Sequence, residues 1–217
     1  MSFSNTIKYL FFVFAISTYK SLPGAYYFRI YWVFLKNLYL YRLFPQFKYN
    51  VNNVFQTQEL HSYNSPLECD FYLHKSNSCY VEELDIARSE LMTSNLQRFF
   101  TEYETKSGQF PFVPVASIWT SFKKEIKPFE RYSIKSKIAA WDEKWIFILS
   151  KFVKNNDQVA SVTITKYVLK DGRKTIRPFD AFKFQGIWTE DAEKTNQKNL
   201  KKVEFFIDNH EIEELDI

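Results

Sequence analysis

One long amphipathic helix followed by a series of short strands constrains the fold of this chain more than any other feature. From about Asn77 to Tyr103, apolar residues recur at spacings of three and four, which is typical of a helix with one buried face. These residues are Tyr80, Leu84, Ala87, Leu91, Leu96 and Phe99. Glycine and proline within residues 106–114 end the helix. We expect the remaining helical carboxylates, Glu83 and Glu90 among them, at the surface or paired with basic side chains.

The segments after residue 130 have the alternation of half-buried strands. Apolar and polar residues alternate over 131–140, and two further strands are predicted at 146–153 and 159–169, separated by polar turns. An earlier strand is predicted at 54–63. Because a sheet of this size must bury one face, the amphipathic helix is its natural cover. The predicted fold is therefore α+β and of the hotdog type, a curved antiparallel sheet wrapped around one long central helix.

The N-terminal residues are apolar, aromatic and free of acidic side chains up to Glu59. Residues 7–17 are almost wholly apolar, but this stretch is shorter than the about 20 residues that a membrane-spanning helix needs. We interpret the segment as membrane-associating, with Lys20 and Arg29 reaching toward lipid headgroups. A cleaved targeting sequence and an ordinary buried helix remain alternatives. The expected location is the endoplasmic reticulum membrane, with the mitochondrion as the alternative.

Three regions follow from these patterns: a hydrophobic and basic segment over 1–48, a domain over 50–188 and a charged tail over 189–217. Whether the tail folds back on the domain is left open. The four glycines are scattered, which excludes a glycine-rich phosphate loop, and two cysteines with three scattered histidines predict no metal site. We expect no cofactor. The basic residues near the N-terminus alternate with bulky apolar ones, which favours a bilayer over nucleic acid.

Reactive side chains gather in the stretch just before the long helix. Asp70, His74 and Asn77 lie within eight residues, and Tyr80 follows in the first helical turn. A helix N-terminus presents backbone N–H groups that can stabilise an oxyanion, and a nearby carboxylate can activate water or attack as a nucleophile. Asp70 is the candidate base or nucleophile, with His74 or Asn77 orienting the carbonyl or the water. The alternative is that these are ordinary capping and packing residues; we interpret Cys79 as packing.

This stretch resembles the 4-hydroxybenzoyl-CoA thioesterase branch of the hotdog superfamily. The matching residues are Asp70, His74, Asn77 and Tyr80, followed by Asp85-Ile86-Ala87-Arg88. Residues 124–145, which contain KPFE and AWD, resemble the corresponding part of the thioesterase-superfamily-member-6 group. Leu73 stands where many members have glycine, and Lys75-Ser76 replaces an apolar residue and an asparagine.

The resemblance implies an acyl-CoA or related acyl-thioester hydrolase that works as a homodimer, with Asp70 at the position of the catalytic carboxylate. Tyr80, Trp141 and Lys124 are the candidate substrate-binding residues. Trp141 would line an acyl tunnel, or else be a core aromatic; Lys124 would meet coenzyme A phosphates, or else lie on a solvated face. The alternative function is a non-catalytic acyl-lipid-binding or scaffold protein that keeps the fold.

Overall fold

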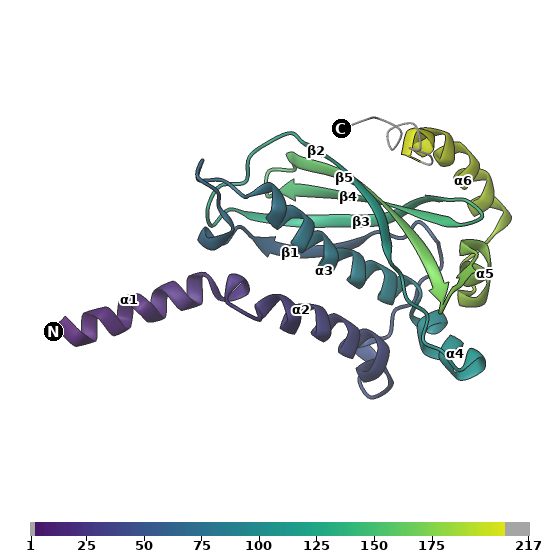
Figure 1. Ribbon diagram of the computed structural model, residues 1–217, viewed down its shortest axis with the longest axis horizontal. Helices are drawn as coiled ribbons and strands as arrows, with labels where there is room; N and C mark the ends of the chain where they lie inside the picture. Colours follow the sequence, from purple (N-terminus) through teal and green to yellow (C-terminus); the bar gives the residue numbers. More distant parts are fainter. Residues whose placement is uncertain (1–2, 207–217) are drawn as a thin grey trace.

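The computed structural model describes residues 3–206 of the chain. Within this part, six strands form one antiparallel sheet that is covered by helices (Figure 1). The main elements are α1 (Phe3–Ser17), α2 (Ala25–Phe34), β1 (Gln58–Tyr63), α3 (Asn77–Asn95), α4 (Gln97–Ser107), β2 (Val115–Phe122), β3 (Arg131–Trp141), β4 (Trp145–Lys154), β5 (Val159–Asp171), β6 (Lys174–Ile176), α5 (Pro178–Gln185) and α6 (Glu190–Val203). The acidic end of the predicted tail, residues 207–217, lies outside the described residues.

The strand order is β1-β3-β4-β5-β2, with β6 pairing with β5. The predicted strands are confirmed as β1, β3, β4 and β5, and the last three form an antiparallel meander. β2, which the sequence patterns left unassigned, pairs with β5 and lies at the edge opposite β1. Helix α3 lies across the sheet (Figure 1). The predicted α+β hotdog architecture is therefore confirmed.

Both faces of the sheet are covered along β4. Its residues Ile146 and Ile148 belong to the core that includes Leu91 of α3, whereas Phe147 between them packs with Val203 of α6 on the other face. The charged tail therefore folds back on the sheet as far as α6. Asn196 fixes this helix, because its side chain accepts a hydrogen bond from the backbone nitrogen of Trp141 at 2.8 Å and donates one to the carbonyl oxygen of the same residue at 3.0 Å.

The long helix predicted from Asn77 to Tyr103 is interrupted at Leu96, where φ is −115° and ψ is 29°. Polar side chains before this point compete with helical geometry. The Thr93 hydroxyl donates to a carbonyl oxygen four residues earlier, at 2.6 Å, and the Asn95 amide donates to the carbonyl oxygen of Gln56 at 3.0 Å. Such side-chain bonds bend helices or end them, so α3 and α4 follow one another as two helices.

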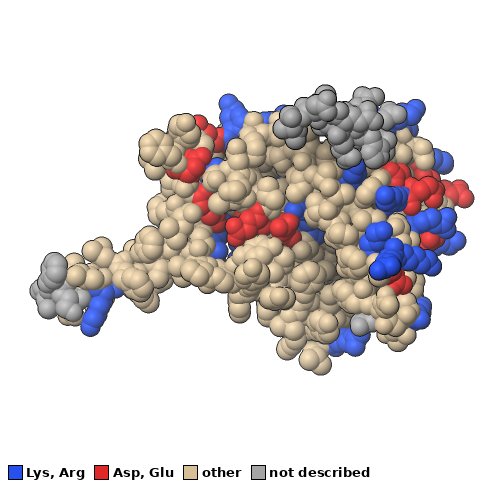
Figure 2. Space-filling view, in the orientation of Figure 1, with Lys and Arg blue, Asp and Glu red and all other residues tan. Residues whose placement is uncertain are grey.

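The N-terminal segment has two differently placed helices. α2 lies along α3, whereas α1 projects away from the rest of the molecule (Figure 1). Large apolar side chains are exposed all along α1; they are Ile7, Tyr9, Leu10, Phe11, Phe12, Val13, Phe14 and Ile16. Figure 2 shows this arm as almost uncharged. Among residues 3–206, no helix combines the length and the apolar character that crossing a bilayer requires.

Candidate active site

The loop between Cys69 and Lys75 presents the reactive residues at the start of α3. A bridge between these two residues closes the loop, and the backbone nitrogen of Asp70 donates to the carbonyl oxygen of His74 at 3.0 Å. At its tip, Leu73 has a φ of 60°, the left-handed conformation that glycine adopts without strain. Leu73, at the position where the resemblance expects a glycine, thus adopts the backbone conformation that glycine favours.

Asp70 and His74 face each other across this loop. Asp70 Oδ1 lies 3.5 Å from His74 Nδ1, and it also accepts a hydrogen bond from the backbone nitrogen of Tyr72 at 2.9 Å. The rings of Tyr72 and His74 stack with their centres 5.9 Å apart. Both the carboxylate and the imidazole are partly exposed, with 32% and 25% of their side chains accessible. The pair is therefore oriented by local contacts and open to a reactant.

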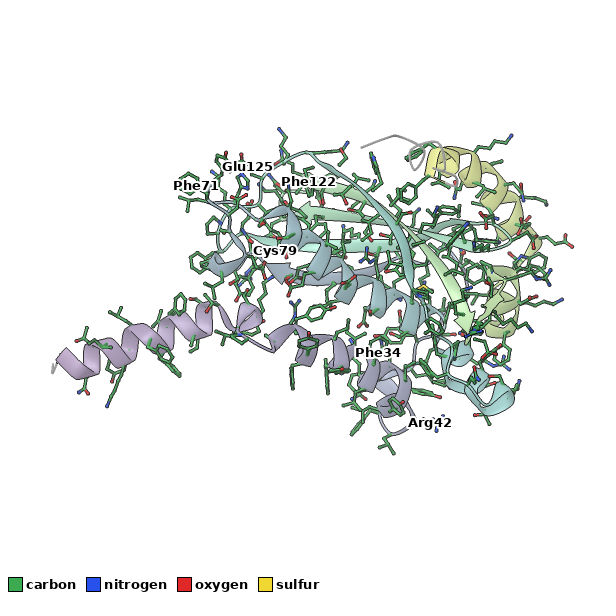
Figure 3. All side chains as sticks on the ribbon, viewed as in Figure 1. Phe34, Arg42, Phe71, Cys79, Phe122 and Glu125 are labelled. Carbon is green, nitrogen blue, oxygen red and sulfur yellow. The ribbon has the colours of Figure 1, made fainter. Side chains whose placement is uncertain are left out.

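A pocket of about 240 Å³, here the His74 pocket, adjoins this pair. It is lined by His74, Lys75, Asn77, Tyr80, Phe122, Lys123, Lys124 and Glu125. Asn77 is exposed in the first turn of α3, and the N-cap Ser76 makes no side-chain capping bond. In Figure 3, Phe71, Cys79, Phe122 and Glu125 mark this end of the molecule. The N-terminus of α3 thus borders the pocket.

Four of the six predicted site residues line this pocket: His74, Asn77, Tyr80 and Lys124. Asp70 is not in this lining but contacts His74, which is. Trp141 lies elsewhere, because its ring is 3% exposed in the core and packs with Phe55 and Phe182, with ring centres 5.6 and 5.0 Å away. Its placement agrees with the alternative of a core aromatic.

A buried group of charges that the sequence did not predict lies behind the loop. We call it the Lys20 cluster; its members are Lys20, Arg29, Glu68, Lys75 and Glu83. Lys20 Nζ lies 2.9 Å from Oε1 of both Glu68 and Glu83, and Lys75 Nζ lies 2.6 Å from Glu68 Oε2. Arg29 donates to both carboxylate oxygens of Glu83, at 2.7 and 3.1 Å. The cluster therefore joins the N-terminal segment to the loop and to α3.

The Lys20 cluster corrects the expectation for Lys20 and decides the one for Glu83. Lys20 is only 3% exposed, so it does not extend toward lipid headgroups. Glu83 is 2% exposed and paired with Lys20 and Arg29, so of its two expected placements the pairing with basic side chains is confirmed. The reason is that α2 covers the face of α3 opposite the sheet. A basic residue between aromatic ones has the same local sequence whether its side chain faces lipid headgroups or a buried carboxylate. Only the contacts with Glu68 and Glu83 show that Lys20 faces buried carboxylates.

Burial and charge act in opposite directions on the pKa values of this cluster. Burial alone would raise the pKa of Glu83, but the Arg29 guanidinium and the ammonium groups of Lys20 and Lys75 lower it to about 2. Burial lowers the pKa of Lys75 against the attraction of Glu68. Nearby, burial raises the pKa of the Cys79 thiol, which agrees with a packing role.

The family model described as "Thioesterase-like superfamily" matches residues 65–188. The chain belongs to this superfamily. The match contains the reactive loop, α3 and the strands from β2 to β6, whereas α1 and α2 precede it. The family resemblance predicted from the sequence is therefore confirmed, and the N-terminal helices are an addition to the part that the family model describes.

Relatives of this thioesterase-like chain include proteins that are named as thioesterases. "Probable thioesterase YBR096W" of Saccharomyces cerevisiae is 44% identical over 210 residues, covering 93% of this chain and 89% of the relative. "Thioesterase lcsJ" of Purpureocillium lilacinum is 36% identical over 144 residues, covering 58% of this chain and 47% of the relative. "Protein THEM6" of Xenopus laevis is 25% identical over 114 residues, covering 48% of this chain and 49% of the relative.

A solved structure supports the fold of this thioesterase-like chain. The hypothetical protein SAV2348 from Staphylococcus aureus, solved in complex with CoA, matches with a TM-score of 0.50 and 13% sequence identity. The match covers 63% of this chain and 92% of the other. At this identity the likeness concerns the fold alone.

Proposed function

We propose that this protein hydrolyses acyl-CoA or a related acyl thioester, with Asp70 as general base or nucleophile. The observation that carries the proposal is the Asp70–His74 pair beside a pocket at the N-terminus of α3, in a chain of the thioesterase-like superfamily. Acting as the base, Asp70 takes a proton from water as the water attacks the thioester carbonyl. The helix N-terminus stabilises the oxyanion, and the carbon–sulfur bond breaks to give an acid and a protonated thiol.

The pocket supports coenzyme A as the thiol carrier. Lys123 and Lys124 are exposed on its rim, where they can meet phosphate groups. Tyr80 forms part of its wall and is held by Phe122 and Phe152, whose ring centres lie 5.1 and 4.7 Å away. The lining therefore combines basic groups for a phosphate with aromatic surface for an apolar chain.

The test is turnover of acyl-CoA substrates of several chain lengths by the full chain. Asp70→Asn keeps the shape but removes the base, so kcat is expected to fall about a hundredfold or more. Asp191→Asn, at an exposed position on α6, is the matched control and is expected to leave kcat unchanged. Equal turnover by wild type and Asp70→Asn would reject the mechanism. Binding of acyl-CoA without turnover by the wild type would support the non-catalytic alternative instead.

We also propose that α1 holds the protein at a membrane, because its apolar side chains are exposed along its whole length. Phe11→Glu with Phe14→Glu is expected to abolish flotation with phosphatidylcholine–phosphatidylserine vesicles. Phe129→Glu makes the same kind of change at an exposed site after β2; it is the control and is expected to leave flotation unchanged. Unchanged flotation of the α1 variant would refute the anchor.

We assign the membrane to the endoplasmic reticulum, with the mitochondrion as the alternative; co-fractionation with organelle markers tests this.

A homodimer is the expected assembly. In the described part of the chain, β2 ends the strand order and has one side without a neighbouring strand. Its residues Val115, Trp119 and Phe122 are exposed. An exposed edge with large apolar side chains is suited to pairing with a second copy about a two-fold axis.

A further inference from the structure

The outer face of α2, which points away from α3, is apolar although it is exposed. Along residues 25–39, which include α2 and the turn after it, the exposed side chains are all aromatic or aliphatic. They are Tyr27, Phe28, Tyr31, Trp32, Leu35 and Tyr39. A helix at a water-exposed surface normally carries polar or charged residues on its outer side. The surface along α2 is almost uncharged in Figure 2, so this face is suited to contact with something other than water.

This face contains an open groove of about 620 Å³, here the Trp32 groove. Seven of its eight lining residues lie within 28–39, and the eighth is Phe110, which follows α4; none of the eight is charged. The end of this segment, Leu35–Tyr39, is a π-helix, a type of turn that often occurs at functional sites. A cavity of about 150 Å³ holds one benzene molecule. The Trp32 groove therefore has room for an extended apolar chain.

The charges and residue types around the groove select a lipid as its occupant. Residues 1–58 contain no acidic residue, and Arg42 and Lys48, which follow the groove in the sequence, are exposed. In Figure 3, Arg42 lies below Phe34, at the lower margin of the molecule. Exposed cations attract the anionic headgroups of a membrane, and tyrosine and tryptophan are enriched where a helix meets the headgroup region. The outer face of α2 combines both features.

The position of α1 brings this face to a lipid surface. Residues 18–24 alone separate α1 from α2, and both helices lie along the same lower margin of the molecule in Figure 1. α1 exposes apolar side chains along its whole length and is the proposed anchor. Once α1 is bound, the outer face of α2 is held beside the bilayer at a high effective concentration.

We propose that the outer face of α2 lies in the headgroup region of a bilayer and that the Trp32 groove binds one acyl chain of a phospholipid. This inference extends the membrane association proposed for α1 and is independent of the hydrolase mechanism. α2 lies along the surface rather than across the bilayer, because it has 10 residues and a membrane-spanning helix needs about 20. The groove thus holds a membrane lipid that is not the substrate.

The test measures tryptophan fluorescence of the full chain with phosphatidylcholine–phosphatidylserine vesicles whose acyl chains are brominated at mid-chain. Bromine quenches an indole ring only at close contact, so a chain in the groove should quench Trp32. The expected loss of emission is the share of one tryptophan among five, and Trp32→Phe should abolish it. Trp119→Phe is the matched control, because Trp119 on β2 is 42% exposed and Trp32 is 44% exposed. This control should leave the quenched intensity unchanged.

Partitioning into unbrominated vesicles of the same composition gives a second measurement. Phe28→Glu with Leu35→Glu places two charges in the groove, so the apolar contact of two side chains is lost and partitioning should weaken about a hundredfold. Phe129→Glu with Phe205→Glu, at two exposed positions outside α2, should leave partitioning unchanged. If the groove variant does not fold, the quenching comparison still decides, because Trp32→Phe is a conservative change.

Equal quenching of wild type and Trp32→Phe would overturn the proposal. Emission from Trp32 that changes with protein concentration but not with lipid would also overturn it, because a second copy would then cover the groove. The result is separable from that for the α1 anchor. If wild type floats with vesicles but Trp32 is not quenched, the anchor stands and the groove proposal fails. If the variant with Phe11→Glu and Phe14→Glu still floats and Trp32 is quenched, the anchor fails and the groove proposal stands.

Discussion

The conformation of Leu73 gives the reactive loop a measurable strain. A non-glycine residue at a φ of 60° costs about 1–2 kcal/mol, and glycine relieves this while adding about 0.5–1 kcal/mol of chain entropy. Leu73 is 71% exposed, so little apolar contact is lost on its removal. Leu73→Gly should therefore stabilise the protein by about 0.5 kcal/mol, measured by urea unfolding. Leu73→Val should destabilise it, because a β-branched side chain fits this conformation poorly; the reverse order would contradict the assigned backbone.

Spacing in the sequence predicted which residues lie close together when they share one short segment. It could not predict contacts between residues that are far apart in the sequence and meet only in the folded chain. Asp70, His74 and Asn77 are close in sequence, and the loop keeps them close in space. Trp141 is far along the chain, and its own neighbourhood left open whether it lines an acyl tunnel or lies in the core, where the structure places it. Lys20 was placed at a membrane for the same reason, since its partner Glu83 lies 63 residues away.

At the scale of elements, contact between α2 and α3 makes stability depend on pH. The folded-state pKa of Glu83 is about 2, below its ordinary value of 4.5. A depressed acid pKa stabilises the fold above the ordinary value, and this contribution is lost as pH falls toward the folded-state value. A shift of this size corresponds to about 3 kcal/mol at neutral pH.

Glu83→Gln should remove most of this contribution. Its free energy of unfolding at neutral pH should be about 3 kcal/mol lower than that of the wild type, and it should fall less steeply between about pH 4.5 and 2. Urea unfolding at a series of pH values measures both effects. Glu143→Gln, whose side chain is 90% exposed, is the control. Parallel curves for wild type and Glu83→Gln would show that Glu83 is not ionised in a buried ion pair.

Periodicity predicted the types of the central elements but not every boundary. The stripe from Tyr80 to Phe99 identified one helix, and the structure divides it at Leu96 because Thr93 and Asn95 bond to backbone groups. β2 was missed: Trp119 and Phe122 are exposed at the sheet edge, so its pattern does not alternate between buried and exposed faces. The α+β class could be predicted from the elements that have one buried face. The edge strand β2 could not be predicted in this way.

At the scale of the whole molecule, pairing through β2 predicts a dimer of measurable strength. Trp119 lies near the middle of β2, so Trp119→Glu would place like charges close to the two-fold axis. Sedimentation equilibrium of the full chain in mild detergent should give the mass of two chains for wild type and of one for Trp119→Glu. Leu43→Glu, at an exposed position after α2, should remain dimeric. A monomeric wild type would exclude this interface.

The Lys20 cluster has a mechanical consequence for the assembled protein. Buried ion pairs from Lys20 to Glu68 and Glu83 leave no flexible tether between the first helices and the loop that carries Asp70. Anchoring α1 in a lipid surface would therefore set the orientation of the His74 pocket as well as its location. A domain on a loose linker samples every direction, whereas this one would present the same opening to the bilayer at all times. Such a catalyst would meet amphiphilic substrates in one fixed pose, so the membrane itself would take part in aligning the reacting thioester.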